Sequence, residues 1–213
     1  MEETIRDIAI WAVPVLLGII LHEVAHGWVA NKLGDSTAAR MGRLTLNPIS
    51  HIDLFGTILL PAILIIGRAP FVFGYAKPVP VNFHNLRNPK RDMIWVALAG
   101  PMTNILLALA SLYLAKYANG AASTLVLTPL FLMAQSSVNI NVMLAAFNLF
   151  PVPPLDGGRV LVGLLPNPYS AVVARIEPFG FLIIIVLLMT HTLDVILEPM
   201  MRFVFGVLQA LSF

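Results

Sequence analysis

Residues 8–33 read IAIWAVPVLLGIILHEVAHGWVANKL, and this stretch decides the class of fold. An unbroken helix of this length spans about 39 Å, more than the roughly 30 Å hydrocarbon core of a bilayer. Its only charged residues are Glu23 and Lys32. Charged groups at membrane depth are costly and by default functional. The stretch is therefore predicted to cross a membrane and to carry a functional site.

The polar residues in the second half of this segment form the pattern His22-Glu23-Val24-Ala25-His26. Two histidines at i and i+4 project from one helix face about one turn apart, so both imidazoles can bind one metal ion. Glu23 is then a candidate general base for metal-assisted chemistry. A lone membrane histidine is more simply a packed or hydrogen-bonded contact. The pairing with a glutamate favours a metal site here.

The composition indicates a membrane protein over the whole chain. Hydrophobic residues make up 58% and charged residues 11% of the 213 residues, and the mean hydropathy is +0.86. Soluble domains carry about a quarter of charged residues. The net charge of +2 does not indicate a nucleic-acid partner, because the basic residues cluster in short loops. Since the chain has no cysteine, metal ligands must come from His, Asp and Glu.

The distribution of basic residues predicts the orientation in the membrane. Lys32, Arg40 and Arg43 follow the first segment closely, which places that end in the cytoplasm by the positive-inside tendency. The acidic N-terminal tail then lies outside, and it lacks the basic start and cleavage site of a signal peptide. We expect a multi-pass protein of the cell inner (plasma) membrane, with its active site nearer the cytoplasmic side.

About six apolar segments predict a membrane all-α fold, a polytopic helical bundle. Residues 38–53 are predicted to form a short hairpin or interfacial strand. Residues 69–82, APFVFGYAKPVPVN, indicate extended backbone, which membrane depth tolerates only under cover of protein or a water-filled cavity. We interpret them as a re-entrant β element near the metal; an ordinary extracytoplasmic loop is the alternative. The apolar segments are residues 8–33, 54–67, 93–115, 124–147, 179–189 and 195–211.

A catalytic zinc site takes three protein ligands and leaves a fourth position for water or substrate. The fourth apolar segment returns residues 148–158, NLFPVPPLDGG, to the predicted depth of the histidine pair. Asp156 is the best candidate for the third ligand, although an aspartate before glycines also forms turns and helix caps. Weaker candidates lie near predicted cytoplasmic loops, where a solvated role is simpler: His51, Asp53 and His84.

Three motifs in this order carry a family resemblance. HEVAH, AGPMTN at residues 99–104 and NLFPVPPLDGG together resemble the site-2 protease family of intramembrane zinc metalloproteases. The segments RMGRLTLNPISHIDLFG and GYAKPVPVN are similar to its compact bacterial and archaeal members. Larger relatives carry an inserted PDZ domain or a C-terminal nucleotide-sensing domain. We expect a single membrane domain over residues 1–213, with a catalytic core at about 8–158 and a candidate gate in the helices of 159–213.

The resemblance implies an activity as well as a fold. It implies one zinc ion per chain, bound by His22, His26 and Asp156, with Glu23 as the base. The expected reaction is hydrolysis of peptide bonds in or near transmembrane segments, so the expected partners are a transmembrane protein or peptide substrate and the lipid bilayer.

Further site residues follow from the same resemblance. Asn148 and Asn104 match family motifs and are candidate catalytic amide donors to an oxyanion; each is equally an interhelical hydrogen-bond partner. The extended segment is a candidate platform for an unwound substrate, which would add to it as a strand. Its candidate substrate-binding residues are Phe73, Gly74, Tyr75, Ala76, Lys77 and Pro78.

Three alternative classes of protein explain the residues less well. A membrane metal-ion transporter could use the same ligands transiently, but it has no need for Glu23 at this spacing. Another intramembrane zinc hydrolase, such as a prenyl-protein endopeptidase, would share the His-Glu motif but not explain the Asp-Gly-Gly turn as well. A membrane scaffold without proteolytic activity has no support, because every proposed ligand and the base are present.

Overall fold

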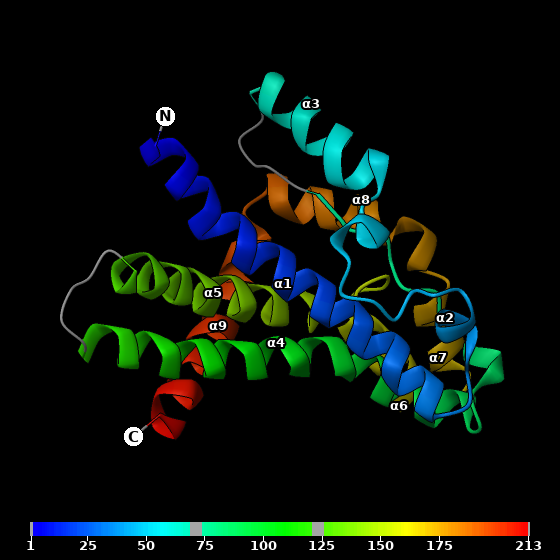
Figure 1. Cartoon of the computed structure of the whole chain (residues 1–213). Helices are drawn as coiled ribbons and strands as arrows, with labels where there is room; N and C mark the ends of the chain where they lie inside the picture. The colour runs from blue at the N-terminus through cyan, green and yellow to red at the C-terminus, as the bar shows by residue number, and fades with distance from the viewer. Residues whose placement is uncertain (1, 69–73, 121–125, 213) are drawn as a thin grey trace.

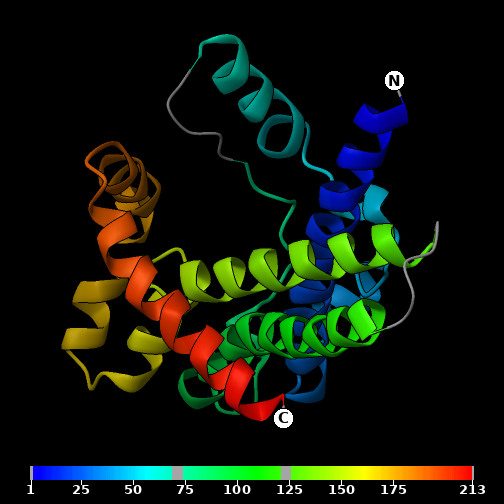
Figure 2. The same cartoon turned by 90° about the vertical axis from the view of Figure 1, so that its left-hand side faces the viewer.

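Helices make up the regular structure of this chain. The computed structural model describes residues 2–68, 74–120 and 126–212, and these ranges contain no strand. Three long helices lie against one another: α1 (Glu2–Lys32), α4 (Pro89–Gly120) and α5 (Leu127–Asn148) (Figure 1). A fourth, α9 (Thr192–Leu211), runs across α5 and α4 (Figure 2). The others are α2 (Thr37–Arg40), η1 (Pro48–His51), η2 (Leu54–Leu59), α3 (Leu60–Ile66), η3 (Phe83–Asn85), α6 (Asp156–Leu164), α7 (Tyr169–Ala174) and α8 (Glu177–Met189).

Three helices in the described part of the chain are long and apolar enough to cross a membrane, namely Ile10–Lys32, Pro89–Asn119 and Leu127–Asn148. Helices α8 and α9 meet at a bend of 89° and would add a fourth span if counted together. The apolar stretch Leu54–Ile66 is shorter than a span. The prediction of a helical membrane protein is confirmed, whereas the number of about six segments in the bundle is not.

Neither predicted β element forms a strand in the described residues. Within residues 38–53 the chain instead forms α2 and the 3-10 turn η1. Residues 74–82 are extended, but the N–H groups of Tyr75 and Lys77 donate to single carbonyls of two short helices, Gly56 in η2 and His51 at the end of η1. Pro78 and Pro80 lack an N–H group, which works against a regular ladder. The re-entrant β element is therefore not confirmed, and its first residues up to Phe73 lie outside the described ranges.

Small residues let the long helices approach closely. Ala97 and Ala108 of α4 and Ala145 of α5 are at most 1% exposed. Gly18 of α1 lies so near α5 that a Cβ atom on it would lie 2.9 Å from Asn141 Oδ1. Between membrane helices, where lipid is as apolar as leucine, such close packing and polar contacts supply the stabilisation. This packing brings polar side chains of three helices to one place inside the bundle.

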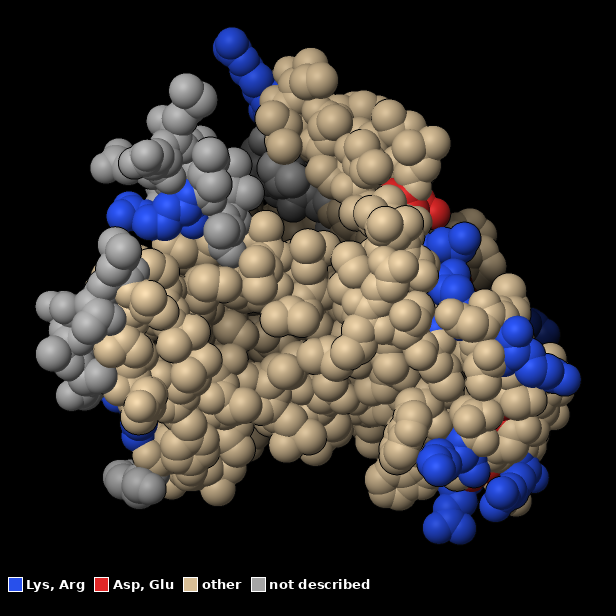
Figure 3. Space-filling model, in the orientation of Figure 1, with Lys and Arg blue, Asp and Glu red and all other residues tan. Residues whose placement is uncertain are grey.

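The surface divides into an apolar middle and a basic end. Figure 3 shows that most Lys and Arg side chains on the visible face gather at the end that contains α2 and α7, while the middle of this face has none. Exposed side chains of the long helices are large and apolar, as for Trp11, Leu17 and Leu106. This distribution fits a protein whose middle faces lipid and whose basic end faces water.

A buried carboxylate joins the end of α1 to the end of the extended segment. Asp35 is fully buried, and its side chain accepts hydrogen bonds from the Asn82 N–H at 2.7 Å and from Asn85 Nδ2 at 2.9 Å. It also accepts from the N–H and the hydroxyl of Thr37. Burial acts to raise the pKa of Asp35, but these hydrogen bonds outweigh it and hold the pKa below its usual value.

Replacement of Asp35 by Asn is expected to lower the free energy of unfolding at pH 7 by about 1–3 kcal/mol, since charged acceptors form the stronger hydrogen bonds. A depressed native pKa stabilises the fold above the unfolded pKa of about 3.9, and this stabilisation is lost as pH falls through the lower native value. The gap between wild type and Asp35→Asn should therefore narrow below about pH 4. The difference in the free energy of unfolding between the two proteins can be measured in mixed detergent micelles at pH 7 and pH 2.5. A difference that does not change with pH would contradict the prediction.

Candidate metal centre

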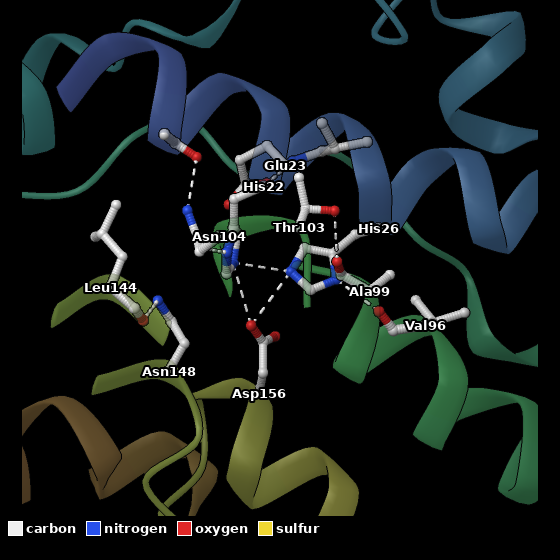
Figure 4. Close-up of polar contacts among 12 residues, drawn as sticks. His22, Glu23, His26, Val96, Ala99, Thr103, Asn104, Leu144, Asn148 and Asp156 are labelled. Atoms are coloured by element: carbon white, nitrogen blue, oxygen red, sulfur yellow. Dashed lines mark hydrogen bonds and ion pairs between the residues drawn. The ribbon is translucent and has the colours of Figure 1, made fainter. Parts of the chain in front are cut away.

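Two helices bring three ligand groups together (Figure 4). His22 and His26 project from one face of α1, and their Nε2 atoms lie 3.0 Å apart. Asp156, the first residue of α6, places its Oδ2 atom 3.2 Å from each of these nitrogens. All three side chains are buried. The structure thus brings together the three residues that the sequence predicted as ligands.

The hydrogen bonds behind the two imidazoles define where their lone pairs point. His26 Nδ1 lies 2.6 Å from the carbonyl oxygen of Val96, which can only accept, so this nitrogen carries the proton. His22 Nδ1 lies 2.6 Å from Asn104 Oδ1 and donates to it in the same way. In the neutral imidazoles, both Nε2 atoms then carry the lone pair that a metal ion needs. Zinc-binding histidines are generally held through their second nitrogen in this manner.

These groups fit a zinc ion. Asp156 Oδ2 has no hydrogen-bond donor within the described residues. Two nitrogen lone pairs and a carboxylate oxygen at 3.0–3.2 Å repel one another unless a cation lies among them. Tetrahedral ligands at about 2.0–2.1 Å from zinc are separated by about 3.3 Å, close to these distances. Two imidazole nitrogens and one carboxylate are also a donor set of catalytic zinc sites.

Gly100 of α4 leaves the space that such an ion needs. A Cβ atom at this position would lie 2.4 Å from His26 Nε2 and 2.6 Å from His22 Nε2. Any other residue would therefore push a carbon atom against both ligand nitrogens. Gly100 and Asn104 are four residues apart on one helix face, so one residue leaves room for the site while the other holds His22.

The Asp-Gly-Gly sequence places Asp156 because glycines permit a close approach of backbone. The chain leaves α5 at Asn148 and turns through a proline-rich segment before α6 begins. A Cβ atom on Gly157 would lie 2.1 Å from the Leu149 carbonyl oxygen. One on Gly158 would lie 2.2 Å from the Pro153 nitrogen. The first turn of α6 can thus lie directly on the preceding loop, which directs Asp156 toward α1.

The carboxylate of Glu23 is held by the extended segment. The backbone N–H of Val79 donates to Glu23 Oε2 at 2.7 Å. Val79 stands between Pro78 and Pro80, neither of which has an N–H to compete for this acceptor. The prediction from sequence placed this segment near the metal but did not identify the Val79 contact, because nothing in a one-dimensional pattern indicates which backbone group reaches α1.

Two cavities border the histidines. One of about 260 Å³ extends among apolar side chains of α1, α5 and α8, including Ile19, Phe147 and Ile184. The other, of about 310 Å³, is lined by both histidines, Asp156 and the cation Arg159. His22 and Glu23 line both cavities, as do Tyr75, Ala76 and Asn148. The candidate centre therefore lies between an apolar space and a second one that Asp156 and Arg159 also line.

The predicted substrate-binding segment borders these spaces unevenly. Gly74 lines the first cavity and Pro78 the second. Lys77 is not among the described residues that line either one: its N–H donates to the His51 carbonyl, and its own carbonyl accepts from Arg43. Phe73 lies outside the described residues.

The two predicted amide donors differ in their surroundings. Asn148 donates one N–H to the Leu144 carbonyl at 3.0 Å and lines both cavities. Asn104 is fully buried, and its amide nitrogen donates to the Gly18 carbonyl and to Asn141 Oδ1. Both amide hydrogens of Asn104 are therefore engaged. This geometry favours the interhelical interpretation for Asn104 and leaves Asn148 as the candidate donor to a substrate.

The three weaker candidate ligands make other contacts. Asp53 caps η2 by accepting from the Phe55 and Gly56 N–H groups. His51 Nε2 donates to the Thr45 carbonyl, and His84 is exposed in η3. In the part of the chain that the structure describes, the cluster able to hold a metal ion consists of His22, His26 and Asp156.

Known proteins that this chain is similar to carry metalloprotease names. The model of Peptidase family M50 matches residues 114–191, which include Asp156. The Bacillus subtilis (strain 168) protein named "Putative zinc metalloprotease YwhC" is 37% identical over 193 residues, 89% of this chain and 84% of that protein. Rip2 of Mycolicibacterium smegmatis, whose name has the same description, is 30% identical over 84% of this chain and 66% of its own length. No solved structure matches the chain.

Proposed function

Because the chain belongs to peptidase family M50 and is a zinc metalloprotease, we propose that it hydrolyses peptide bonds in or near transmembrane segments of membrane-protein substrates. The main observation behind this proposal is the buried group of two histidine nitrogens and one carboxylate oxygen. Both histidines belong to a helix that is long and apolar enough to cross a membrane. A metalloprotease centre at that depth acts most directly on substrates that share the bilayer. The transporter and scaffold interpretations are set aside, because the family is one of peptidases.

In this proposal one zinc ion per chain is held by His22, His26 and Asp156. Zinc, when bound, lowers the pKa of a water molecule and polarises a peptide carbonyl. Glu23 accepts the proton of the attacking water and returns it to the leaving amine. Asn148 donates its second amide hydrogen to the oxyanion that develops on the substrate carbonyl. The Val79 N–H keeps the Glu23 carboxylate at the edge of both cavities.

The two cavities support separate routes for substrate and water. The apolar cavity among α1, α5 and α8 suits a transmembrane segment that enters from lipid. The second cavity, which the charged side chains of Asp156 and Arg159 line, suits water from the basic end of the molecule, which we assign to the cytoplasmic side of the inner membrane. Because α8 contributes Phe181 and Ile184 to the apolar cavity, the helices after residue 158 are the proposed gate.

Cleavage by purified protein in liposomes tests the function. The substrate is a transmembrane segment reconstituted with the enzyme, and mass spectrometry of the products locates the cut. We expect cleavage in or near the segment, toward its cytoplasmic end, that stops on zinc chelation and returns with added zinc. His26→Ala should lose the zinc and lower the rate about 10³-fold or more.

His84→Ala is the matched control, because His84 is an exposed histidine outside the cluster. It should keep the zinc and the rate. Cleavage that persists without zinc, or that occurs only in soluble parts of the substrate, would contradict the proposal.

A further inference from the structure

Buried polar side chains continue from His22 across the interface of three helices. Asn104 of α4 and Asn141 of α5 are 0% and 1% exposed. Asn104 Nδ2 lies 2.8 Å from Asn141 Oδ1, and Asn141 Nδ2 lies 2.9 Å from the carbonyl oxygen of Ser137. Polar groups in an apolar interior are costly unless each is paired, so these contacts are held firmly. The proposed catalytic residues do not include Asn141.

Two backbone carbonyls define the direction of every hydrogen bond in this chain of groups. The Ser137 carbonyl can only accept, so Asn141 turns its amide nitrogen to it and its oxygen to Asn104. The Gly18 carbonyl also can only accept, and it takes the other hydrogen of the Asn104 amide at 3.1 Å. The oxygen of Asn104 is therefore left for His22 Nδ1, at 2.6 Å. No other amide orientation satisfies all of these contacts.

We infer that Asn141 is a positioning residue for the metal centre, acting through Asn104 to hold His22 with its Nε2 atom toward His26 and Asp156. The inference rests on the proposed zinc function and deepens it. Hydrogen-bonding partners behind zinc-binding histidines typically change metal affinity by about 10–100-fold.

The physical reason is the prevention of an amide flip. If the Asn104 amide turned over, its oxygen would face the Asn141 oxygen and the Gly18 carbonyl, and its nitrogen would face His22. His22 would then favour the tautomer with its proton on Nε2, where a metal ligand needs a lone pair. Without the Asn141 oxygen, one of the two acceptors that oppose this flip is lost.

Zinc affinity, measured by competition with a chelator in detergent, tests the inference directly. Asn141→Leu keeps the branched shape and removes the acceptor, so we expect zinc to bind about tenfold or more weakly. Asn104→Leu should weaken binding about 10–100-fold. Because Asn141 acts through Asn104, the double variant should bind zinc no more weakly than Asn104→Leu alone. Asn139→Leu is the matched control, an exposed asparagine of the same helix, and should bind as wild type does.

A second variant reaches the same oxygen from another helix. A Cβ atom at Gly18 would lie 2.9 Å from Asn141 Oδ1, so Gly18→Ala should displace that oxygen and weaken zinc binding severalfold. Gly18→Ala replaces Asn141→Leu in the test if the latter does not fold, as judged by size exclusion and by thermal unfolding of the metal-free protein.

The possible results separate the two proposals. Wild-type protein that does not bind zinc would overturn the proposed function itself. If the wild-type protein binds zinc, and folded Asn141→Leu and Gly18→Ala bind it with the same affinity, the positioning role alone is overturned. Losses that multiply in the double variant would also overturn it, because the two asparagines would then act independently.

Discussion

Glu23→Gln is expected to lower the rate of substrate cleavage about 10²–10⁴-fold while the protein keeps its zinc. Glutamine has nearly the shape of glutamate but cannot take a proton from water at neutral pH. Its amide oxygen can still accept the Val79 N–H, so the extended segment should keep its place against α1. The effect should therefore fall on the proton transfer and not on the fold or on metal binding.

Single-turnover cleavage in liposomes measures the cleavage rate, and elemental analysis measures the zinc content. Glu198→Gln is the matched control, because Glu198 is an exposed glutamate of α9 that pairs with Arg202. It should leave the cleavage rate unchanged. A Glu23→Gln protein that cleaves within tenfold of the wild-type rate would remove Glu23 from the role of base.

Gly100→Ala is expected to weaken zinc binding by at least about 100-fold and to lower cleavage with it. The added methyl group would lie within 2.6 Å of both Nε2 atoms, so it pushes the imidazoles from their ligand positions. Alanine favours a helix over glycine by about 1 kcal/mol. Overpacking typically costs about 1–3 kcal/mol, which this gain partly offsets. The metal-free protein should therefore still fold, and the loss of zinc should not be one of folding.

Chelator competition for zinc and thermal unfolding of the metal-free protein separate these two effects. Gly206→Ala provides the control, since a Cβ atom at this position in α9 would meet no described atom within 4 Å. It makes the same chemical change in a helix of the same protein and should bind zinc normally. Wild-type zinc affinity in Gly100→Ala would show that the centre has more room than the structure indicates.

The sequence predicts those features that depend on periodicity and composition. The helical membrane class follows from long apolar runs, and the grouping of His22 with His26 follows from the 3.6-residue repeat. Asp156 was predicted at the same depth from the order of segments, and the structure places it 3.2 Å from both histidines. Its role as a ligand remains a prediction.

Contacts between helices could not be predicted in the same way. The space at Gly100, the Asn141–Asn104 contact and the Val79 N–H each depend on how one helix or segment is rotated against another. A polar residue in an apolar helix, such as Asn141, is a signal that one of these sites exists. It does not identify the partner. The strand predicted at residues 69–82 is not confirmed, because in its described part, residues 74–82, the prolines and the single contacts with η1 and η2 do not form a ladder.

The location of Asp156 far downstream of the histidines has a consequence for how the protein matures. Chains emerge from the ribosome N-terminal end first. The two histidines of α1 are thus made well before α4 and α5, against which α1 packs, and Asp156 follows only after these helices. In the proposed mechanism, a partly synthesised chain in the membrane has the base Glu23 but not the complete set of zinc ligands. The proposed zinc site, and the proteolysis that depends on it, would therefore be completed late in synthesis, after the helices that surround it.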